Sequence, residues 1–389
     1  MKNITVIGAG YVGLSLALLL SKNNSVSVLD IDESRVRDIN QKKSYLDDVD
    51  IHKMYKDNNL NIVSEKYDAN SLKDAEFFIL ALPTNFNEEL GSFDVSILKS
   101  CISDILEQTS ESPIIIKSTV PIGFSNNCND EFNTDRIFFS PEFLREGRSI
   151  HDNIFPSRII IGGNGDSRLN LFKKCLKEIA ENNPAILETG NSEAEAIKLF
   201  SNTYLSVRIG FFNEIDSFAI KNNLDASQII TSIGLDPRIG STYNNPSFGF
   251  GGYCLPKDSK QAVTHFKNVP NTIISSIPES NLKRKEFIAR DIISRKPNII
   301  GVYRLVMKGG SDNFRESASI DVINKLLEFD QKIIIYEPLI SQDNFEGIPV
   351  IDDIEEFKKV SNLIIANRNE LEISDISDKV YTRDIFGDN

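Results

Sequence analysis

The stretch ITVIGAGYVG, residues 4–13, decides the fold of the N-terminal part of the chain. Its first four residues are apolar and predict a short strand, and Gly8, Gly10 and Gly13 follow with the spacing G-x-G-x-x-G. Gly8 permits a tight turn, Gly10 lets the backbone approach a pyrophosphate, and Gly13 allows a helix to pack closely on the strand. The apolar segment that follows predicts this helix, whose N-terminus offers unpaired N–H groups to phosphates.

An acid follows the glycines at the distance that this motif requires. Residues 25–29 predict a second strand, and Asp30 comes directly after it. A carboxylate there accepts hydrogen bonds from a ribose diol and repels a 2′-phosphate, which favours NAD over NADP. Arg35 lies close enough in sequence to weaken that preference. The alternative is a glycine turn that only packs one strand–helix unit, and the surrounding pattern favours the nucleotide site.

The strand–helix pattern continues with three apolar segments, FFILALPT (77–84), IIIKSTVPIG (114–123) and RIFFSPEFLREG (136–147). Each predicts a strand that ends in a polar loop. Because carboxyl ends of parallel strands meet at one sheet edge, these loops should gather there. The polar residues expected at that edge are Thr84, Thr119, Glu142, Arg145 and Glu146. Taken singly, the charged ones could also be solvated loop residues.

Residues 192–223 predict one long helix, because apolar residues recur at spacings of three and four and no proline interrupts them. Ser192 and Glu195 fit a capping box at its start. Lys198 and Asn202 are four residues apart and share a face. They are either a surface pair or two donors directed at one oxygen, and spacing alone leaves both open.

After residue 290 the strand–helix pattern restarts, with strands predicted at 298–303, 332–336 and 362–366 and a helix at 317–329. This second region lacks a G-x-G-x-x-G motif. The predicted fold class is therefore α/β, with two Rossmann-like doubly wound domains joined by a long central helix. The predicted domains span residues 1–190, 191–290 and 291–389.

The segment FGFGGYCLPKD, residues 248–258, carries Cys254 in a glycine-rich stretch that predicts irregular backbone. A cation, Lys257, and an anion, Asp258, follow it. This setting suits a thiolate nucleophile or a metal ligand better than a core residue. The chain's four cysteines and three histidines are scattered, which argues against a metal site. Cys101 and Cys175 fall in helical patterns and are expected to be buried, reduced thiols.

Composition excludes several function classes. The net charge is −13, 25% of residues are charged and 40% are hydrophobic, as in a soluble globular protein. No basic stretch interleaves with aromatic residues, so nucleic acid is not expected as a partner. The chain has no apolar run long enough to span a membrane, and its first residues lack the features of a signal peptide. We therefore expect a cytoplasmic protein.

Seven segments, in the same order along the chain, resemble the UDP-glucose/GDP-mannose dehydrogenase family, and most of all its UDP-glucose branch. They are GAGYVG, KSTVPIG, SPEFLREG, EAIKLFSNTYLSVRIGFFNE, DPRIGSTYNNPSFGFGGYCLPKD, GVYRLVMKGGSDNFRES and VYTRDIFG. The resemblance implies NAD-dependent, four-electron oxidation of UDP-glucose at C6 to UDP-glucuronate, a precursor of capsule and other surface polysaccharide. It also implies a covalent thiohemiacetal and thioester on Cys254.

The resemblance assigns roles to residues. The implied catalytic residues are Cys254, Lys198, Asn202, Asp258, Thr119 and Glu142, the last with a raised pKa for thioester hydrolysis. The implied NAD-binding residues are Gly8, Gly10, Tyr11, Val12, Gly13, Asp30, Arg35, Thr84, Thr119, Glu146, Lys257 and Arg315. The implied substrate-binding residues are Glu142, Phe143, Leu144, Arg145, Glu146, Lys198, Asn202, Arg238, Tyr243, Asn244, Asn245, Pro246, Ser247, Gly251 and Lys308.

The resemblance also implies an assembly and leaves alternatives. Arg238 would reach the substrate of a neighbouring subunit, so a homodimer through the central domain is expected, with the C-terminal domain binding the UDP-sugar. Residues 42–53 and 164–191 depart from the family pattern and are expected to be surface loops. The alternatives are a sibling enzyme for GDP-mannose or a UDP-N-acetylhexosamine, a non-catalytic regulator, and a one-step dehydrogenase that releases the aldehyde.

Overall fold

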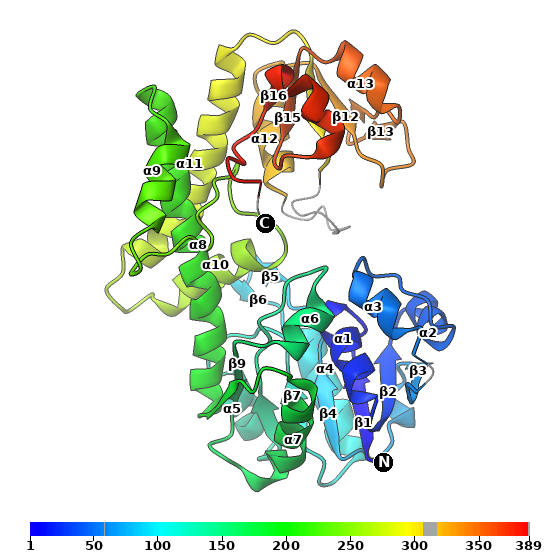
Figure 1. Cartoon of the computed structure of the whole chain (residues 1–389). Helices are drawn as coiled ribbons and strands as arrows, with labels where there is room; N and C mark the ends of the chain where they lie inside the picture. Colours follow the sequence, from blue (N-terminus) through cyan, green and yellow to red (C-terminus); the bar gives the residue numbers. More distant parts are fainter. Residues whose placement is uncertain (58, 306–316, 388–389) are drawn as a thin grey trace. The chain divides into compact units, whose positions relative to one another are not determined.

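The computed structural model describes residues 1–57, 59–305 and 317–387, and these form two compact units, Met1–Phe200 and Ser201–Asn389 (Figure 1). The boundary falls inside α8 (Asn191–Lys221), a helix of 31 residues that confirms the predicted long central helix. No helix within the described residues is long and apolar enough to cross a membrane.

The first unit is built on a six-stranded parallel sheet with the strand order β3-β2-β1-β4-β7-β8. Its strands are β1 (Asn3–Ile7), β2 (Ser25–Asp30), β3 (Ile62–Lys66), β4 (Phe77–Leu80), β7 (Ile114–Ile116) and β8 (Ile137–Phe139). In register, Ile4 pairs with Val26 on one side and with Phe77 on the other. The order reverses next to β1, which is where open sheets of this class bind nucleotides.

Alternation along the strands divides the core of this unit into two layers. Val6 and Ile79 pack with helices α1 and α7 on one face, while Ile7 and Leu80 pack with α4 and α5 on the other. Successive strand residues point to opposite faces, so near-continuous apolar strands are needed when helices cover both. The helices of this unit are α1 (Tyr11–Leu20), α2 (Glu33–Asn40), α3 (Val49–Met54), α4 (Ser96–Gln108), α5 (Phe124–Glu131), α6 (Ser149–Ile154) and α7 (Asn170–Ile179).

Short elements complete the first unit. β9 (Arg158–Ile161) and β10 (Ala185–Glu188) form a parallel pair, and β5 (Phe86–Asn87) and β6 (Ser92–Phe93) form an antiparallel one. A single 3₁₀ turn, η1 (Ala69–Ser71), precedes β4, and another, η2 (Ser167–Leu169), precedes α7.

The second unit contains most of α8 and a four-stranded parallel sheet with the order β12-β11-β15-β16. Its strands are β11 (Ile300–Tyr303), β12 (Ile333–Tyr336), β15 (Leu363–Ala366) and β16 (Val380–Tyr381), with a small hairpin of β13 (Asn344–Phe345) and β14 (Ile348–Pro349). Its helices are α9 (Ala226–Gly234), α10 (Cys254–His265), α11 (Ile273–Ser294), α12 (Ala318–Leu327), α13 (Ile354–Val360) and the 3₁₀ segment η3 (Leu371–Lys379). The predicted restart of the strand–helix pattern is confirmed.

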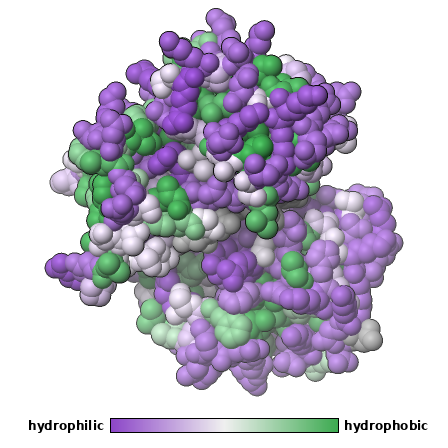
Figure 2. All heavy atoms as spheres, turned by 45° about the horizontal axis from the view of Figure 1, so that its top comes forward, coloured by the Kyte–Doolittle hydropathy of each residue, from purple (hydrophilic) through white to green (hydrophobic). Residues whose placement is uncertain are grey.

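Apolar side chains remain exposed along α8 and the segment that follows it. Tyr204, Phe211 and Phe218 recur every seven residues and are half or more exposed, at 60%, 50% and 58%. Leu235, after α9, is 79% exposed. Figure 2 shows apolar side chains gathered on the side of the molecule where α8 and α9 lie, against a largely hydrophilic surface elsewhere on that face.

Two local expectations were wrong. Glu195 does not complete a capping box with Ser192: its carboxylate accepts hydrogen bonds from the backbone N–H groups of Gly123 and Ser125, at 2.5 and 2.8 Å. The start of α5 has no capping side chain of its own, so this buried carboxylate satisfies it from a distance.

The two departing segments are not surface loops. Residues 42–53 include most of α3 and place Leu46, Asp48 and Ile51 in the interior. Residues 164–191 contain α7 and β10. The Asp48 carboxylate holds two elements together, since it accepts from Ile51 N at the start of α3 and from Ser149 N at the start of α6.

Candidate active site

The first glycine turn has the geometry that its sequence predicts. Gly8 has φ +98°, and a Cβ there would lie 2.4 Å from the Ala81 carbonyl oxygen. A Cβ on Gly13 would lie 1.9 Å from the Gly8 carbonyl oxygen, so helix α1 packs too closely for any side chain at that position. Gly10, by contrast, has open space around it. The backbone at Gly10 is therefore accessible to a ligand.

Two side chains hold the peptide groups of Ala9, inside this turn. The buried Asp30 carboxylate accepts from Ala9 N at 2.7 Å and from Asp32 N at 2.9 Å. The Tyr45 hydroxyl donates to Ala9 O at 2.5 Å, a contact that the sequence did not reveal. The Arg35 guanidinium lies 3.7 Å from the Asp30 carboxylate. A carboxylate has about four acceptor positions, so Asp30 can still accept from a ribose hydroxyl.

The start of α1 fits a pyrophosphate. Gly10 is its N-cap, without a capping side chain, and its first turn, which includes Tyr11 and Val12, has no acidic residue. The first N–H groups of a helix carry a partial positive charge and attract phosphate oxygens. These residues fit a dinucleotide, with Asp30 at its ribose.

The strand-end threonines lie together. The Thr84 hydroxyl, after β4, donates to the backbone oxygen of Thr119, after β7, at 2.6 Å, and both residues are buried. Ser118 makes a parallel contact with Leu82 O at 2.6 Å. Two of the loops at the carboxyl edge of the sheet, those after β4 and β7, are therefore hydrogen-bonded to each other.

Glu142 and Lys198 form a buried ion pair in the first unit. Lys198 Nζ donates to Glu142 Oε1 and to the Glu142 backbone oxygen, both at 2.7 Å. Leu144 N donates to the other carboxylate oxygen at 2.6 Å. Burial alone would raise the pKa of Glu142, but Lys198 and the Leu144 N–H lower it more, so the pKa lies below its usual value. The predicted raised pKa is wrong because of this pairing.

A second ammonium group, Lys117, lies close to this pair and was missed from the sequence. It is buried at the end of β7 and donates to Pro141 O at 3.1 Å. Burial lowers the pKa of Lys117 to about 8, with Lys198 adding to the shift and Glu142 opposing it. The signal was present in the segment KSTVPIG, where a lysine follows a fully apolar strand.

The neighbouring residues of the loop 142–147 face different partners. The Phe143 ring lies under the Arg158 guanidinium at 3.9 Å and near Lys198 Nζ at 5.4 Å. The Arg145 guanidinium binds both oxygens of Asp152, with its shorter contact at 2.6 Å. Glu146 is half-buried.

A second cluster lies in the second unit, around the start of α10. Asp258 is fully buried, and its two carboxylate oxygens accept from Asn202 Nδ2 at 2.6 Å and from Lys257 Nζ at 3.0 Å. Burial alone would lower the pKa of Lys257, but the Asp258 carboxylate, with further contributions from Cys254 and Tyr253, raises it above its usual value. Lys257 is therefore a buried cation beside the thiol.

Cys254 is the first residue of helix α10, so the expectation of irregular backbone at this residue was wrong. The N-cap, Tyr253, makes no capping hydrogen bond with its side chain. A helix N-terminus and a neighbouring lysine both stabilise a thiolate. Cys254 is partly exposed, whereas Cys101, Cys128 and Cys175 are buried. Burial raises the pKa of both Cys101 and Cys128 to about 12 and also raises that of Cys175.

The loop 243–251 precedes this cluster. Tyr243, with φ 60°, is 42% exposed, while Pro246 and Ser247 are buried and Gly251 is half-buried. The side-chain amides of two asparagines are engaged within the unit. Asn244 bonds with Arg208 at 2.5 Å and Asn245 with Asp384 at 2.6 Å.

Arg238 is exposed at the surface, where it pairs with Asp236 at 2.5 Å. Lys308 and Arg315 lie outside the described residues. Among the residues that the structure describes, no group of three or more His, Cys, Asp or Glu side chains could hold a metal ion.

The parallel sheet, its glycine turn and the acid that ends β2 define a dinucleotide-binding protein of the Rossmann class. Three family models match in order: the NAD binding domain of the UDP-glucose/GDP-mannose dehydrogenase family at residues 2–180, its central domain at 192–283 and its UDP binding domain at 301–386. The chain belongs to the UDP-glucose/GDP-mannose dehydrogenase family, and its cofactor is NAD.

Similar proteins cover almost the whole chain. A UDP-glucose 6-dehydrogenase of Streptococcus pneumoniae is 45% identical over 99% of both chains, and one of Campylobacter jejuni is 46% identical over 98% of both. Among solved structures, a UDP-glucose dehydrogenase from Pyrobaculum islandicum has a TM-score of 0.82 at 23% identity, covering 94% of this chain and 90% of that one. A UDP-D-ManNAc dehydrogenase from Pyrococcus horikoshii also has a TM-score of 0.82 at 23% identity, covering 98% and 93%. The two structural likenesses establish the fold.

Proposed function

We propose that this protein oxidises UDP-glucose at C6 to UDP-glucuronate with two molecules of NAD. The observation that carries the proposal is the full-length identity of 45–46% with two UDP-glucose 6-dehydrogenases. The enzyme is an NAD-dependent dehydrogenase, and its substrate is the nucleotide sugar of its near relatives.

When bound, NAD would supply the hydride acceptor for each of the two oxidations. The residues proposed to hold it are the turn Gly8–Gly13, Asp30 with Arg35, Thr84, Thr119, Glu146, Lys257 and, outside the described residues, Arg315. Support comes from the open backbone at Gly10 and the buried Asp30 carboxylate.

In the first oxidation, C6 gives up a hydride and its hydroxyl proton leaves toward Asp258 through a water. Lys198 and Asn202 donate to the C6 oxygen and stabilise its developing negative charge. Spacing along the sequence left their function open, and their buried positions exclude a surface pair. Asn202 donates to Asp258 in the structure, which supports a shared role at the same oxygen.

Cys254 retains the half-oxidised product. Its thiolate attacks the aldehyde carbon, an S–C6 bond forms, and the carbonyl oxygen takes up a proton to give a thiohemiacetal. Loss of that proton and of a second hydride gives a thioester. Water then adds to C6, the S–C6 bond breaks with its electron pair returning to sulfur, and the carboxylate leaves.

Glu142 and Thr119 are proposed to direct the hydrolytic water. Because Lys198 lowers the pKa of Glu142, this residue is a carboxylate at neutral pH and can accept a proton from the water without first losing one. We therefore propose that Glu142 acts as a general base in its resting, ionised form, and not as an acid with a raised pKa.

The substrate is proposed to contact Glu142 to Glu146, Lys198, Asn202, Tyr243 to Ser247, Gly251 and Lys308. The amides of Asn244 and Asn245 already have partners, so these two residues would contact it through their backbone. The domain roles proposed are NAD binding for residues 1–190, dimerisation for 191–290 and UDP-sugar binding for 291–389.

The assembly proposed is a homodimer through α8 and α9. Support comes from the exposed stripe of Tyr204, Phe211 and Phe218, because contiguous exposed apolar side chains mark interaction surfaces. The exposed Arg238 is proposed to reach the neighbouring subunit's substrate. We further propose a cytoplasmic location and use of the product in capsule or other surface polysaccharide.

Product stoichiometry tests the function. UDP-glucose should yield two NADH per UDP-glucuronate. GDP-mannose and UDP-N-acetylglucosamine should yield little NADH and little of the corresponding sugar acid. Cys254→Ser should still bind UDP-glucose but lose roughly 10³-fold or more in acid formation, since the covalent intermediate can no longer form in the normal way. Cys175→Ser is the matched control and should keep full activity. Normal UDP-glucuronate output from Cys254→Ser would contradict the mechanism.

A further inference from the structure

The loop that leads to Cys254 depends on side chains from distant elements. Residues 243–250 belong to no helix or strand, yet most of them are buried. Buried backbone N–H and C=O groups need hydrogen-bond partners. Asn213 on α8 accepts from Ser247 N at 2.9 Å, and Asn281 on α11 accepts from Phe250 N at 2.9 Å and donates to Phe250 O at 2.8 Å. The loop therefore has the conformation that these side chains impose.

Arg284, also on α11, contacts the same loop. Its Nε and Nη2 both donate to the backbone oxygen of Ser247, at 3.0 and 2.9 Å. Its Nη1 donates to Asn213 O at 3.0 Å and to Ser217 Oγ at 2.6 Å. Arg284 thus joins the loop to α8 and contacts the same Asn213 that holds Ser247 N.

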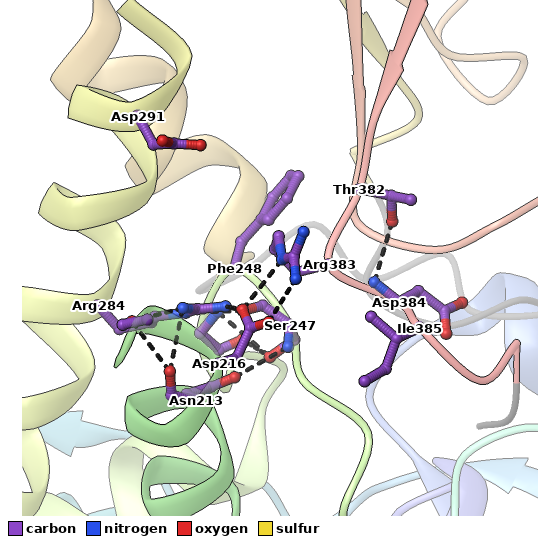
Figure 3. A network of polar contacts seen from close by, with 12 residues as sticks. Asn213, Asp216, Ser247, Phe248, Arg284, Asp291, Thr382, Arg383, Asp384 and Ile385 are labelled. Atoms are coloured by element: carbon purple, nitrogen blue, oxygen red, sulfur yellow. Dashed lines mark hydrogen bonds and ion pairs between the residues drawn. The ribbon is translucent and has the colours of Figure 1, made fainter. Parts of the chain in front are cut away.

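A buried carboxylate, Asp216, orients Arg284 and is itself bound by the C-terminal segment. Arg284 Nη2 donates to Asp216 Oδ2 at 2.6 Å, and Arg383 Nε donates to the same oxygen at 3.0 Å. The Arg383 Nη2 group also binds the other oxygen, Oδ1. Figure 3 shows Arg284 and Arg383 converging on Asp216 beside Ser247 and Phe248. Asp216 is fully buried and Arg284 almost so, whereas the Arg383 side chain is 19% exposed.

The residue after Arg383 makes a second connection to the same loop. Asn245 Nδ2 donates to Asp384 Oδ1 at 2.6 Å, and Ile385 N donates to Asn245 Oδ1 at 3.1 Å. Asp384 is fixed in turn by Asn369 N, which donates to its Oδ2 at 2.9 Å. The C-terminal segment 382–385 therefore contacts the loop directly at Asn245 and indirectly, through Asp216 and Arg284, at Ser247.

We propose that Arg383 is a positioning residue for the UDP-sugar. By binding Asp216 it fixes Arg284 against Ser247 O and so sets the conformation of the loop 243–250, whose backbone contacts the substrate. This inference rests on the proposed function for the identity of the ligand. Arg383 acts through Asp216 and takes no part in the chemistry at C6.

Arg383 is the member of this network that can be removed with the least disturbance. In Arg383→Ala the buried Asp216 carboxylate keeps Arg284 as its partner, so no buried charge is left alone. Arg383→Lys keeps the charge but lacks the forked donors that bind both oxygens of one carboxylate. The alanine variant should therefore loosen the loop 243–250, and the lysine variant should keep part of the wild-type order of that loop.

The first experiment separates affinity from turnover. Arg383→Ala should raise KM for UDP-glucose about tenfold or more, because a small displacement of a substrate-positioning group weakens binding strongly. kcat should change by less than about threefold and KM for NAD should stay the same. Arg383→Lys should lie between wild type and alanine. Arg295→Ala is the matched control: Arg295 stacks on Tyr381, two residues before Arg383, at 4.7 Å and should leave all three constants unchanged.

The second experiment needs no turnover. Hydrogen exchange should be at least about tenfold faster at the amides of Ser247, Phe248 and Phe250 in Arg383→Ala than in wild type, while the amides of β11 keep their wild-type rates. If wild type does not oxidise UDP-glucose, the proposed function fails, and this exchange result still decides whether Arg383 orders the loop. If Arg383→Ala does not fold, the exchange and KM comparisons are made with Arg383→Lys. The proposal is overturned if the loop amides of Arg383→Ala exchange at wild-type rates. It is also overturned if Arg383→Ala has a lower melting temperature but an unchanged KM for UDP-glucose.

Discussion

Two glycine turns lead into helices in this protein, and they are stabilised in different ways. The turn before α1 is held from within the first 45 residues: Gly13 packs on Gly8 O, Asp30 binds Ala9 N across 21 positions and Tyr45 binds Ala9 O across 36. The loop before α10 is held from much further away. Asn367 binds Phe248 N across 119 positions, at 3.3 Å, and Asn245 binds Asp384 across 139, at 2.6 Å.

The difference separates a motif from a tertiary arrangement. A turn whose contacts are local is specified by a few consecutive residues, because each of its glycines satisfies one steric requirement. A loop whose contacts are remote has a sequence that is compatible with many conformations. Its native conformation is selected by polar side chains on other elements, so changes far from the loop should alter it.

The largest expected effect is at the centre of the remote network. Asp216→Asn removes the charge that neutralises Arg284, which is buried, and should lower the free energy of unfolding by about 3–5 kcal/mol. Denaturant titration measures it. Asp236→Asn is the control, because the Asp236–Arg238 pair is at the surface and its loss should have no measurable effect. Equal stability of the two variants would show that the loop does not depend on the buried charges.

The comparison also explains what sequence could reveal. The fold class, the long helix and the second strand–helix region follow from periodicity, and Gly8, Gly13 and Asp30 follow from local steric and chemical demands. The resemblance pointed to Lys198, Asn202, Cys254 and Asp258. It could not show that Lys198 pairs with Glu142, which reverses the expected pKa shift.

Contacts between distant side chains were not predictable by the same reasoning. Nothing local to Glu195 indicates that it caps α5, and nothing local to Arg383 indicates that it binds Asp216. Each pairing depends on which elements the fold brings together. A single sequence gives a side chain's charge and approximate burial but not its partner.

A pair of glycine variants sharpens the comparison from the side of the local turn. Gly13→Ala places a Cβ 1.9 Å from Gly8 O and should destabilise the protein by about 3 kcal/mol, because backbone atoms on both sides must shift. Gly10→Ala meets nothing within 4 Å and should change stability by less than about 0.5 kcal/mol.

The same pair distinguishes folding from NAD binding. Gly10→Ala should weaken NAD binding at least about tenfold, because the added methyl group lies where the backbone would meet the pyrophosphate. Calorimetric titration measures the affinity. If Gly10→Ala binds NAD normally, the cofactor does not approach this turn.

The smallest expected effect is a difference in acid sensitivity. Glu142 has a lowered pKa, so its ion pair with Lys198 contributes stability that is complete above the ordinary carboxyl pKa of 4.5 and is lost as pH falls through the lower folded value. Glu142→Gln lacks this contribution. The gap in unfolding free energy between wild type and Glu142→Gln should therefore be largest near pH 7 and should shrink below about pH 4.5.

Glycine contacts are uncharged, so Gly10→Ala should retain the acid sensitivity of wild type. Urea unfolding at a series of pH values provides both comparisons. A gap between wild type and Glu142→Gln that stays constant down to pH 3 would show that Glu142 is not held as a carboxylate by Lys198.

The contrast among the four cysteines has a practical consequence. Three are buried with raised pKa values, while Cys254 is partly exposed at a helix start beside a cation. An alkylating reagent at neutral pH should therefore label one thiol per chain, and bound nucleotide sugar should slow that labelling. The number of alkylated thiols per chain, measured by intact-protein mass spectrometry, would therefore count the reactive active sites before any assay of turnover.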